Sequence, residues 1–135
     1  MKFLVDANIL SELTKPNPSN TVVDWLRQNE AAIAVDPIIL GEIRFGIHLL
    51  PPGKKREHLE IWFLNVVQTI HCLPLQAQTG LRWAELLAEL RKAGKAMPIK
   101  DSFISATALH HDLTVVTRNV YDFEKAGVRV INPFG

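Results

Sequence analysis

Short apolar runs alternate along this 135-residue chain with longer segments in which apolar residues recur at helical spacing. The first run, residues 3–5, has no polar alternation, which is typical of a strand buried on both faces. Strands that alternate with helices form a parallel sheet covered by helices on both sides. The pattern therefore predicts an α/β fold whose central parallel sheet has about four to five strands, flanked by helices on both faces.

The expected strands cover residues 3–5, 32–35, 70–73, 114–117 and 128–131. The expected helices cover residues 21–29, a segment that begins at Pro37, and residues 54–67, 76–93 and 101–111. Asp36 stands directly before Pro37, a position at which an aspartate caps a helix. In the longest helix the expected apolar stripe consists of Leu81, Leu86, Leu87 and Leu90.

Composition limits the class of protein. Hydrophobic residues make up 47% of the chain and charged residues 21%, which excludes an intrinsically disordered protein. The length suits a single domain, residues 1–135. One cysteine, Cys72, excludes an internal disulfide framework and a four-cysteine metal site. Because no apolar run has the length of an export signal or a membrane span, we expect a cytoplasmic protein. The net charge of +1 does not indicate a nucleic-acid partner.

Acidic residues recur where the predicted topology would form a ligand site. In open α/β sheets, ligands bind beyond the carboxyl ends of the strands. Candidate residues at or near that edge are Asp6 after the first strand, Glu42 within the helix from Pro37, Asp101 at the start of its helix, and Asn119 and Asp122 after the fourth strand. Each acid alone also has a structural explanation, as a helix cap or as a surface residue.

Convergence of these acids would require a cation. Two carboxylates about 4 Å apart repel by roughly 4 kcal/mol at an effective dielectric constant near 20. Ligation by oxygen atoms alone suits Mg²⁺, with Mn²⁺ as a plausible substitute, whereas zinc would favour histidines, and none of the five histidines adjoins these acids. The predicted metal ligands are Asp6, Glu42, Asp101 and Asp122. Such a site indicates a metal-assisted phosphodiester hydrolase.

Four segments carry a resemblance to a known family: residues 4–11 (LVDANILS), 41–46 (GEIRFG), 99–108 (IKDSFISATA) and 116–123 (VTRNVYDF). In order and spacing they resemble the PIN-domain nucleases, and most of all the VapC-type toxins, which are the ribonuclease halves of VapBC toxin–antitoxin pairs. The resemblance covers the whole chain. It implies a Mg²⁺-dependent endoribonuclease that forms a homodimer, cleaves RNA by a metal-activated water, and is silenced by an antitoxin protein.

The resemblance also implies roles for single residues. Asp6 and Asp101 match the central metal ligands of the family, and Glu42 and Asp122 match its supporting acids. Asn119 falls where some members carry an acid, so either Asn119 or Asp122 completes the site. An asparagine there could also hydrogen-bond a carboxylate and orient it. Ala7 departs from the family pattern, because members often have a threonine or serine at that position.

Two arginines are candidates for binding substrate phosphate, Arg44 beside Glu42 and Arg118 beside Asn119, although either could instead pair with a carboxylate. The basic run at residues 54–56 fits an RNA contact or a solvated helix start. Two other functions stay open. One is a housekeeping PIN-domain nuclease without an antitoxin. The other is a non-catalytic Mg²⁺-binding signalling module, which would carry two adjacent acids after its first strand.

Overall fold

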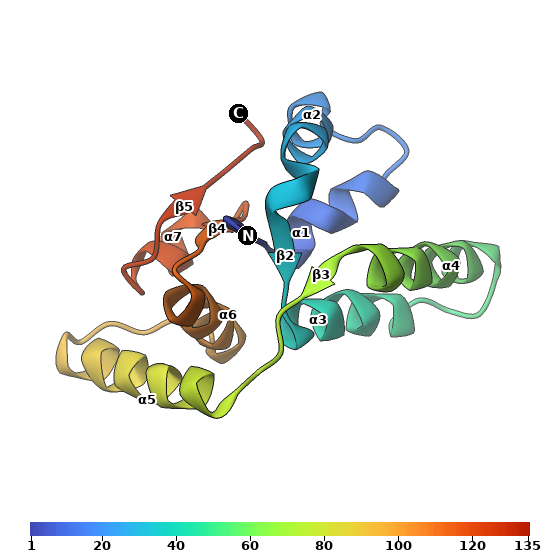
Figure 1. The fold of residues 1–135 in the computed structure, drawn as a ribbon. Coiled ribbons are helices and arrows are strands. Elements are labelled where there is room, and N and C mark those ends of the chain that lie inside the picture. The colour runs from blue at the N-terminus through green and yellow to red at the C-terminus, as the bar shows by residue number, and fades with distance from the viewer.

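The computed structural model describes residues 1–135 and has a five-stranded parallel sheet with the strand order β3-β2-β1-β4-β5 (Figure 1). The strands are β1 (Phe3–Val5), β2 (Ile33–Val35), β3 (His71–Cys72), β4 (Thr114–Val116) and β5 (Val130–Ile131). All four strand pairings are parallel. The predicted α/β class and parallel sheet are confirmed, and each strand lies inside its expected segment.

Seven α-helices connect the strands: α1 (Ala7–Leu10), α2 (Asn20–Asn29), α3 (Pro37–His48), α4 (Lys54–Thr69), α5 (Ala77–Lys92), α6 (Ile99–His111) and α7 (Val120–Glu124). Two 3₁₀ turns, η1 (Ser11–Thr14) and η2 (Glu30–Ala32), complete the list. The sequence pattern predicted α2, α4, α5 and α6 within about two residues at each end, and it predicted the start of α3 at Pro37. It missed α1 and α7, because four or five residues are too few to show helical periodicity.

Strand β1 occupies the centre of the sheet. Phe3 pairs with Ile33 on one side and with Thr114 on the other, and both neighbouring strands run parallel to β1. The backbone N–H of Asp6 donates to the carbonyl of Val116 at 2.9 Å, so the β1–β4 pairing continues one residue past the strand. Since parallel strands end at one edge of a sheet, the residues after β1, β2 and β4 lie side by side there.

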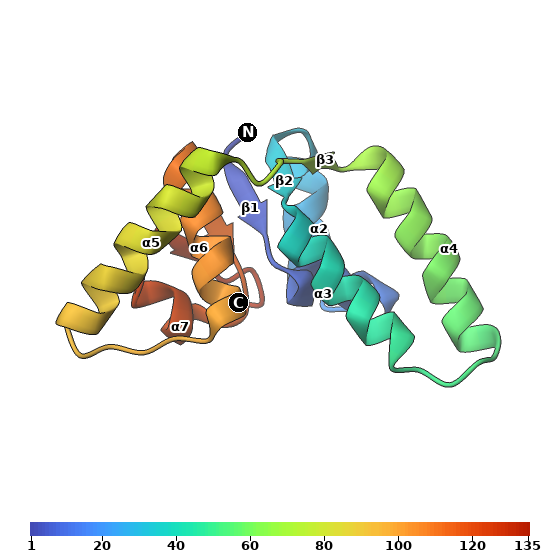
Figure 2. The same cartoon turned by 90° about the horizontal axis from the view of Figure 1, so that it is seen from below.

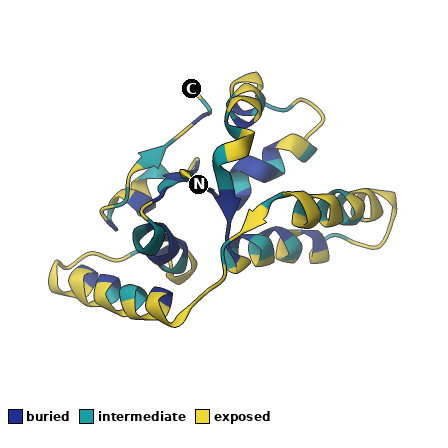
Figure 3. Ribbon diagram, viewed as in Figure 1, coloured by how far each residue is buried: buried dark blue, intermediate teal, exposed yellow.

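Apolar side chains from both sides of the sheet form the core. Leu4, Ile39, Ile104 and Phe123 have no exposed surface and belong to one cluster of 17 buried residues. A smaller cluster lies beneath α5 and contains Leu86, Leu90 and Ala126. Figure 3 shows that α4 and α5 turn mainly exposed surface outward, and α4 has no fully buried residue.

The apolar stripe predicted for α5 is partly wrong. Leu86 and Leu90 are buried and Leu87 is half-buried, but Leu81 is 68% exposed. The packed face runs through Thr79, Leu86 and Leu90, at helical spacing. Leu81 lies two residues from Thr79, about 200° around the helix, and therefore points to solvent.

Two helix pairs flank the central strand. Figure 2 shows α3 and α4 on one side of β1, and α5 and α6 on the other. None of the helices combines the length and the apolar character needed to cross a membrane.

Asp36 connects the helix pair α3 and α4 to the helix pair α5 and α6. Its side chain accepts a hydrogen bond from the backbone N–H of Ile39 at 2.9 Å, which caps α3 as the sequence predicted. The hydroxyl of Thr107 on α6 donates to its other oxygen at 2.7 Å. Asp36 has no exposed surface, and burial raises its pKa although both hydrogen bonds oppose the rise. The residue therefore ties α3 to α6, the helices that carry Glu42 and Asp101.

We expect Asp36→Ala to lower the free energy of unfolding by about 2–3 kcal/mol, because it leaves a buried hydroxyl and a helix N–H without an acceptor. Urea denaturation measures this loss. The matched control is Asp24→Ala on α2, whose exposed carboxylate pairs loosely with Arg27 at 3.8 Å, and its effect should stay below about 0.5 kcal/mol. Equal losses for the two variants would contradict a special role for Asp36.

Candidate active site

Four carboxylates gather at the carboxyl edge of the sheet. Asp6 directly follows β1, Asp101 lies in the first turn of α6, Glu42 lies on α3, and Asp122 lies in α7. Asp6 and Asp101 are only 4% and 5% exposed. Burial raises the pKa of Asp101, and the charges of Asp6, Asp122 and Glu42 raise it further, so each of these three groups lies within electrostatic reach of Asp101.

Asp6 is held by its neighbours from two strands. One carboxylate oxygen accepts from the backbone N–H of Ala7 at 2.8 Å, which caps α1. The other accepts from the hydroxyl of Thr117, directly after β4, at 2.8 Å. Burial raises the pKa of Asp6, and the charge of Glu42 raises it further, whereas the Thr117 hydrogen bond lowers it. The orientation of this carboxylate therefore depends on the β1–β4 pairing.

The amide of Asn119 connects two of the acids. Its Nδ2 donates to Asp101 Oδ2 at 3.1 Å and to Asp122 Oδ2 at 2.9 Å. The expected contact between Asn119 and a neighbouring carboxylate is thus present. The second oxygen of Asp122 accepts from Lys125 Nζ at 3.3 Å. The Asn119 hydrogen bond, followed by the Lys125 interactions, lowers the pKa of Asp122.

Glu42 carries the one carboxylate oxygen of this group that is buried and has no partner. Its Oε1 lies 2.7 Å from Lys100 Nζ, whereas Oε2 has no hydrogen-bond donor. A buried carboxylate oxygen without a donor is costly. The ion pair with Glu42 raises the pKa of Lys100, so its ammonium stays charged. Lys100 therefore provides one positive charge among several negative ones.

The oxygen ligands offered by these side chains fit a hard divalent cation. The candidate ligands are all carboxylates, one of their oxygens lacks a partner, and burial followed by the charge of Asp6 raises the pKa of Asp101 to about 6. No three acidic, histidine or cysteine side chains already surround one point. Instead, Lys100 and Asn119 hold oxygens of Glu42, Asp101 and Asp122. A cation would have to replace part of these contacts.

Three further residues of the site were not predicted from the sequence: Asn8, Lys100 and Thr117. Asn8 accepts from the backbone N–H of Arg118 at 3.2 Å and so links the segments after β1 and β4. Thr117 directly follows β4, just as Asp6 directly follows β1. This position at the carboxyl end of a strand is the sequence feature that could have identified Thr117 as a site residue. Its hydroxyl reaches Asp6 from a strand distant in sequence, next to Ala7, whose side chain has no hydroxyl.

The two candidate arginines do not pair with these acids. The guanidinium of Arg118 lies over the ring of Phe134, 4.5 Å from its centroid. Arg44 turns toward α4, where its guanidinium lies 5.7 Å from the ring centroid of Phe63, and its Nε donates to His48 at 3.2 Å. Neither arginine makes an ion pair in the structure, although the contacts from Lys15 and Ser19, followed by the charge of Arg118, lower the pKa of Glu12.

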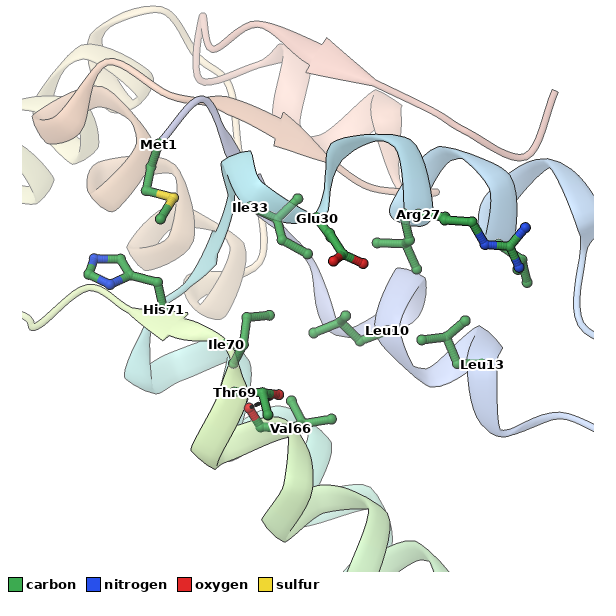
Figure 4. Close-up of a pocket in the computed structure, with 12 residues that line it drawn as sticks. Met1, Leu10, Leu13, Arg27, Glu30, Ile33, Val66, Thr69, Ile70 and His71 are labelled. Carbon is green, nitrogen blue, oxygen red and sulfur yellow. Dashed lines mark hydrogen bonds between the residues drawn. The ribbon is translucent and has the colours of Figure 1, made fainter.

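An apolar pocket of about 530 Å³ lies apart from the acids (Figure 4). Leu10, Leu13, Ile33, Val66 and Ile70 are among its lining residues, which come from α1, η1, α2, β2, α4 and the segment around β3. None of the candidate site residues lines it. The chemistry of the chain therefore concentrates in the acidic cluster and not in this pocket.

The pKa of Asp101 predicts how stability depends on pH. Because the folded pKa of about 6 exceeds the unfolded value, its ionisation destabilises the metal-free fold as the pH rises from about 4 to above 6. We expect the free energy of unfolding of Asp101→Asn to exceed that of the parent by about 1–2 kcal/mol at pH 7.5, after allowance for partial solvent access. This difference in stability should disappear near pH 4. Urea denaturation in EDTA at both pH values measures it, and a pH-independent difference would contradict the assignment.

Comparison with known proteins agrees with this geometry. A family model described as PIN domain matches residues 3–128. The chain is 38% identical to the plasmid stability protein StbB of Pseudomonas syringae pv. tomato, over 98% of both chains. It is 33% identical to the VapC ribonuclease Y4jK of Sinorhizobium fredii, over 98% of this chain and 97% of that protein. Toxin FitB of Neisseria gonorrhoeae is 34% identical over 98% of both.

Solved structures show the same fold. A chain from the structure of FitAB bound to a DNA fragment superposes with a TM-score of 0.91 and 31% identity, covering 98% of this chain and 96% of that one. A chain from the crystal structure of FitAcB from Neisseria gonorrhoeae gives a TM-score of 0.85 and 34% identity, over 98% of both chains. The sequence match, the fold and the acidic cluster agree, and the chain belongs to the PIN-domain family, among its VapC-type members.

Proposed function

We propose that this protein is a Mg²⁺-dependent endoribonuclease and the toxin of a type II toxin–antitoxin pair, acting in the cytoplasm. The observation that carries the proposal is the cluster of Asp6, Glu42, Asp101 and Asp122, with an unpartnered Glu42 oxygen, in a PIN-domain chain. The named function of the Sinorhizobium relative, a VapC ribonuclease, supports RNA as the substrate. The absence of histidine from the cluster favours Mg²⁺ or Mn²⁺ over zinc.

In the proposed mechanism the chain positions the ion, the water and the phosphate. Asp6 and Asp101 hold the cation, and Glu42 and Asp122 support it or orient the attacking water. When bound, Mg²⁺ supplies polarisation of the scissile phosphate and lowers the pKa of a water. Thr117 keeps Asp6 in place, and Asn119 does the same for Asp101 and Asp122. The unpartnered Oε2 of Glu42 can accept a hydrogen bond from the water.

Arg44 and Arg118 are proposed to bind substrate phosphates on either side of the cluster. Neither guanidinium makes an ion pair, so both are free to meet an anion. We further propose that the protein forms a homodimer and is inhibited by a cognate antitoxin. The structure of FitAB, in which the related toxin occurs together with FitA and DNA, supports a protein partner of this kind.

The signalling-module alternative is less well supported. Such a module needs an aspartate that is free to react, and the residues after Asp6 are Ala7 and Asn8, not a second acid. Asp36 after β2 is fully buried, and its two oxygens accept from Ile39 and Thr107. The housekeeping nuclease would use the same acids, so it differs from the toxin only in its biological partner.

We expect Asp6→Asn to reduce Mg²⁺-dependent cleavage of single-stranded RNA by at least about a hundredfold, because a neutral amide binds a hard cation poorly. Cleavage of a fluorescently labelled RNA with and without EDTA measures this effect. The control is Asp24→Asn, which replaces an exposed carboxylate on α2 and should cleave the RNA as fast as the parent. A folded Asp6→Asn variant that cleaves as fast as the parent would exclude this active site.

Expression in a bacterial host separates the toxin from the housekeeping enzyme. We expect production of the chain alone to arrest growth, since a free toxin cleaves cellular RNA, and Asp6→Asn to relieve the arrest. Co-expression of the protein encoded immediately upstream should restore growth. Normal growth with the active chain, together with a defect in maturation of a stable RNA when its gene is deleted, would favour the housekeeping nuclease.

A further inference from the structure

Three basic side chains meet where α3 and α4 lie side by side. Arg44 Nε donates to His48 Nε2 at 3.2 Å, and Arg56 Nη2 lies 3.2 Å from His48 Nδ1. Two guanidinium groups thus bracket one imidazole ring. We call Arg44, His48 and Arg56 the basic cluster.

The basic cluster has more donors than acceptors. An imidazole ring offers at most one acceptor nitrogen, whereas a guanidinium only donates. If Nε2 accepts from Arg44, then Nδ1 carries a hydrogen that faces the N–H groups of Arg56. One carboxylate reaches the cluster, Glu60, which is 3.1 Å from Arg56 Nε. Arg44 has no acidic partner, and an anion with several acceptor oxygens would satisfy these competing donors.

The surroundings of the basic cluster point to a nucleic-acid strand. Lys54 and Lys55 are exposed at the start of α4 and make no ion pair, which extends the positive charge along the surface. Phe45, 63% exposed, lies between Glu42 and His48 along α3 and offers a ring face on which a base can stack. Positive charge next to an exposed aromatic ring is the usual composition of a single-strand binding surface.

The position of the basic cluster relative to the acids fits one continuous strand. His48 lies six positions after Glu42 on α3, a rise of about 9 Å and a rotation of about 120° around the helix axis. A strand that joins the two therefore crosses the side of α3 between them, where Phe45 lies. Phosphates within a strand are about 3.4 Å apart along a stacked helix, so the cluster lies a few nucleotides from the site of cleavage. Figure 2 shows that α3 runs away from the end of β2 and lies beside α4.

We propose that the basic cluster binds the phosphate backbone of the RNA strand a few nucleotides from the scissile bond, with Phe45 stacking on a base. The inference rests on the proposed function and extends it to a second contact for the substrate. Arg44 and Arg56 neutralise phosphates, and His48 accepts a hydrogen bond from one of the two guanidinium groups. This contact does not read sequence, because a phosphate is the same at every nucleotide.

The test measures RNA affinity in the Asp6→Asn background, where cleavage does not interfere. Fluorescence anisotropy with a labelled single-stranded RNA gives the association constant at several KCl concentrations. Arg44→Gln and Arg56→Gln should each weaken binding about three- to tenfold and flatten the slope of log K against log [KCl] by about 0.7 per lost contact. Arg44→Lys should restore most of the affinity. Phe45→Ala should weaken binding without changing the slope, because stacking releases no ions.

The matched control is Arg91→Gln. Arg91 is an exposed arginine on α5 without an ion pair, and this variant should bind RNA like its parent. In the active protein, Arg44→Gln should raise KM and leave kcat within about twofold. If the parent protein cleaves RNA while the Arg44→Gln and Arg56→Gln forms bind RNA normally, this inference and the substrate contact proposed for Arg44 are overturned, and the proposed nuclease activity stands. Loss of antitoxin binding instead of RNA binding in these variants would assign the surface to a protein partner and also overturn it. A parent chain that cleaves no RNA would overturn the proposed function itself.

Discussion

The cost of placing carboxylates together inside a protein organises this molecule. Asp6 and Asp101 are almost fully buried, and each raises the free energy of the other's charge. The chain offsets part of this cost with neutral donors, the hydroxyl of Thr117 and the amide of Asn119, and part with the ammonium groups of Lys100 and Lys125. These groups do not remove the repulsion, because the pKa of Asp101 remains near 6. The remaining demand for positive charge supports our proposal that the cluster binds a cation.

The sheet topology makes such a cluster possible. Because β1 lies between β2 and β4, the residues after three parallel strands meet at one edge. Asp6 occupies the middle position, and Asp36 and Thr117 occupy the positions on either side. Asp36 and Asp6 both follow a buried strand and both cap a helix, yet their roles differ. Asp36 accepts donors on both oxygens and connects α3 to α6, whereas Asp6 faces other carboxylates.

Local pattern was enough to predict the strands, the long helices and the acids, because buried strands and helix faces each leave a periodic trace in sequence. Asp6, Asp101 and Asp122 were found because each lies close after a strand or begins a helix, whereas Glu42 was found within the helix that begins at Pro37. Thr117 and Lys100 were missed because their roles depend on partners that only the fold supplies. Thr117 meets Asp6 across 111 positions of sequence, and Lys100 meets Glu42 on another helix. The error at Leu81 has a different cause, since Leu81 lies about 180° around α5 from Leu90 and so was not on the same helix face.

The net charge of +1 conceals an uneven distribution of charge. Negative charge gathers between α3 and α6, and positive charge gathers about 9 Å along α3, where that helix meets α4. A polyanionic substrate would be repelled by the acids alone, since their charge has the same sign as its phosphates. In the proposed function, a divalent cation at the acids and guanidinium groups farther along the helix would reverse that sign at two separate points. Two attachment points, one of them reactive, would hold a strand in register more firmly than either point alone, so a nearly neutral net charge is compatible with the proposed action on a nucleic acid.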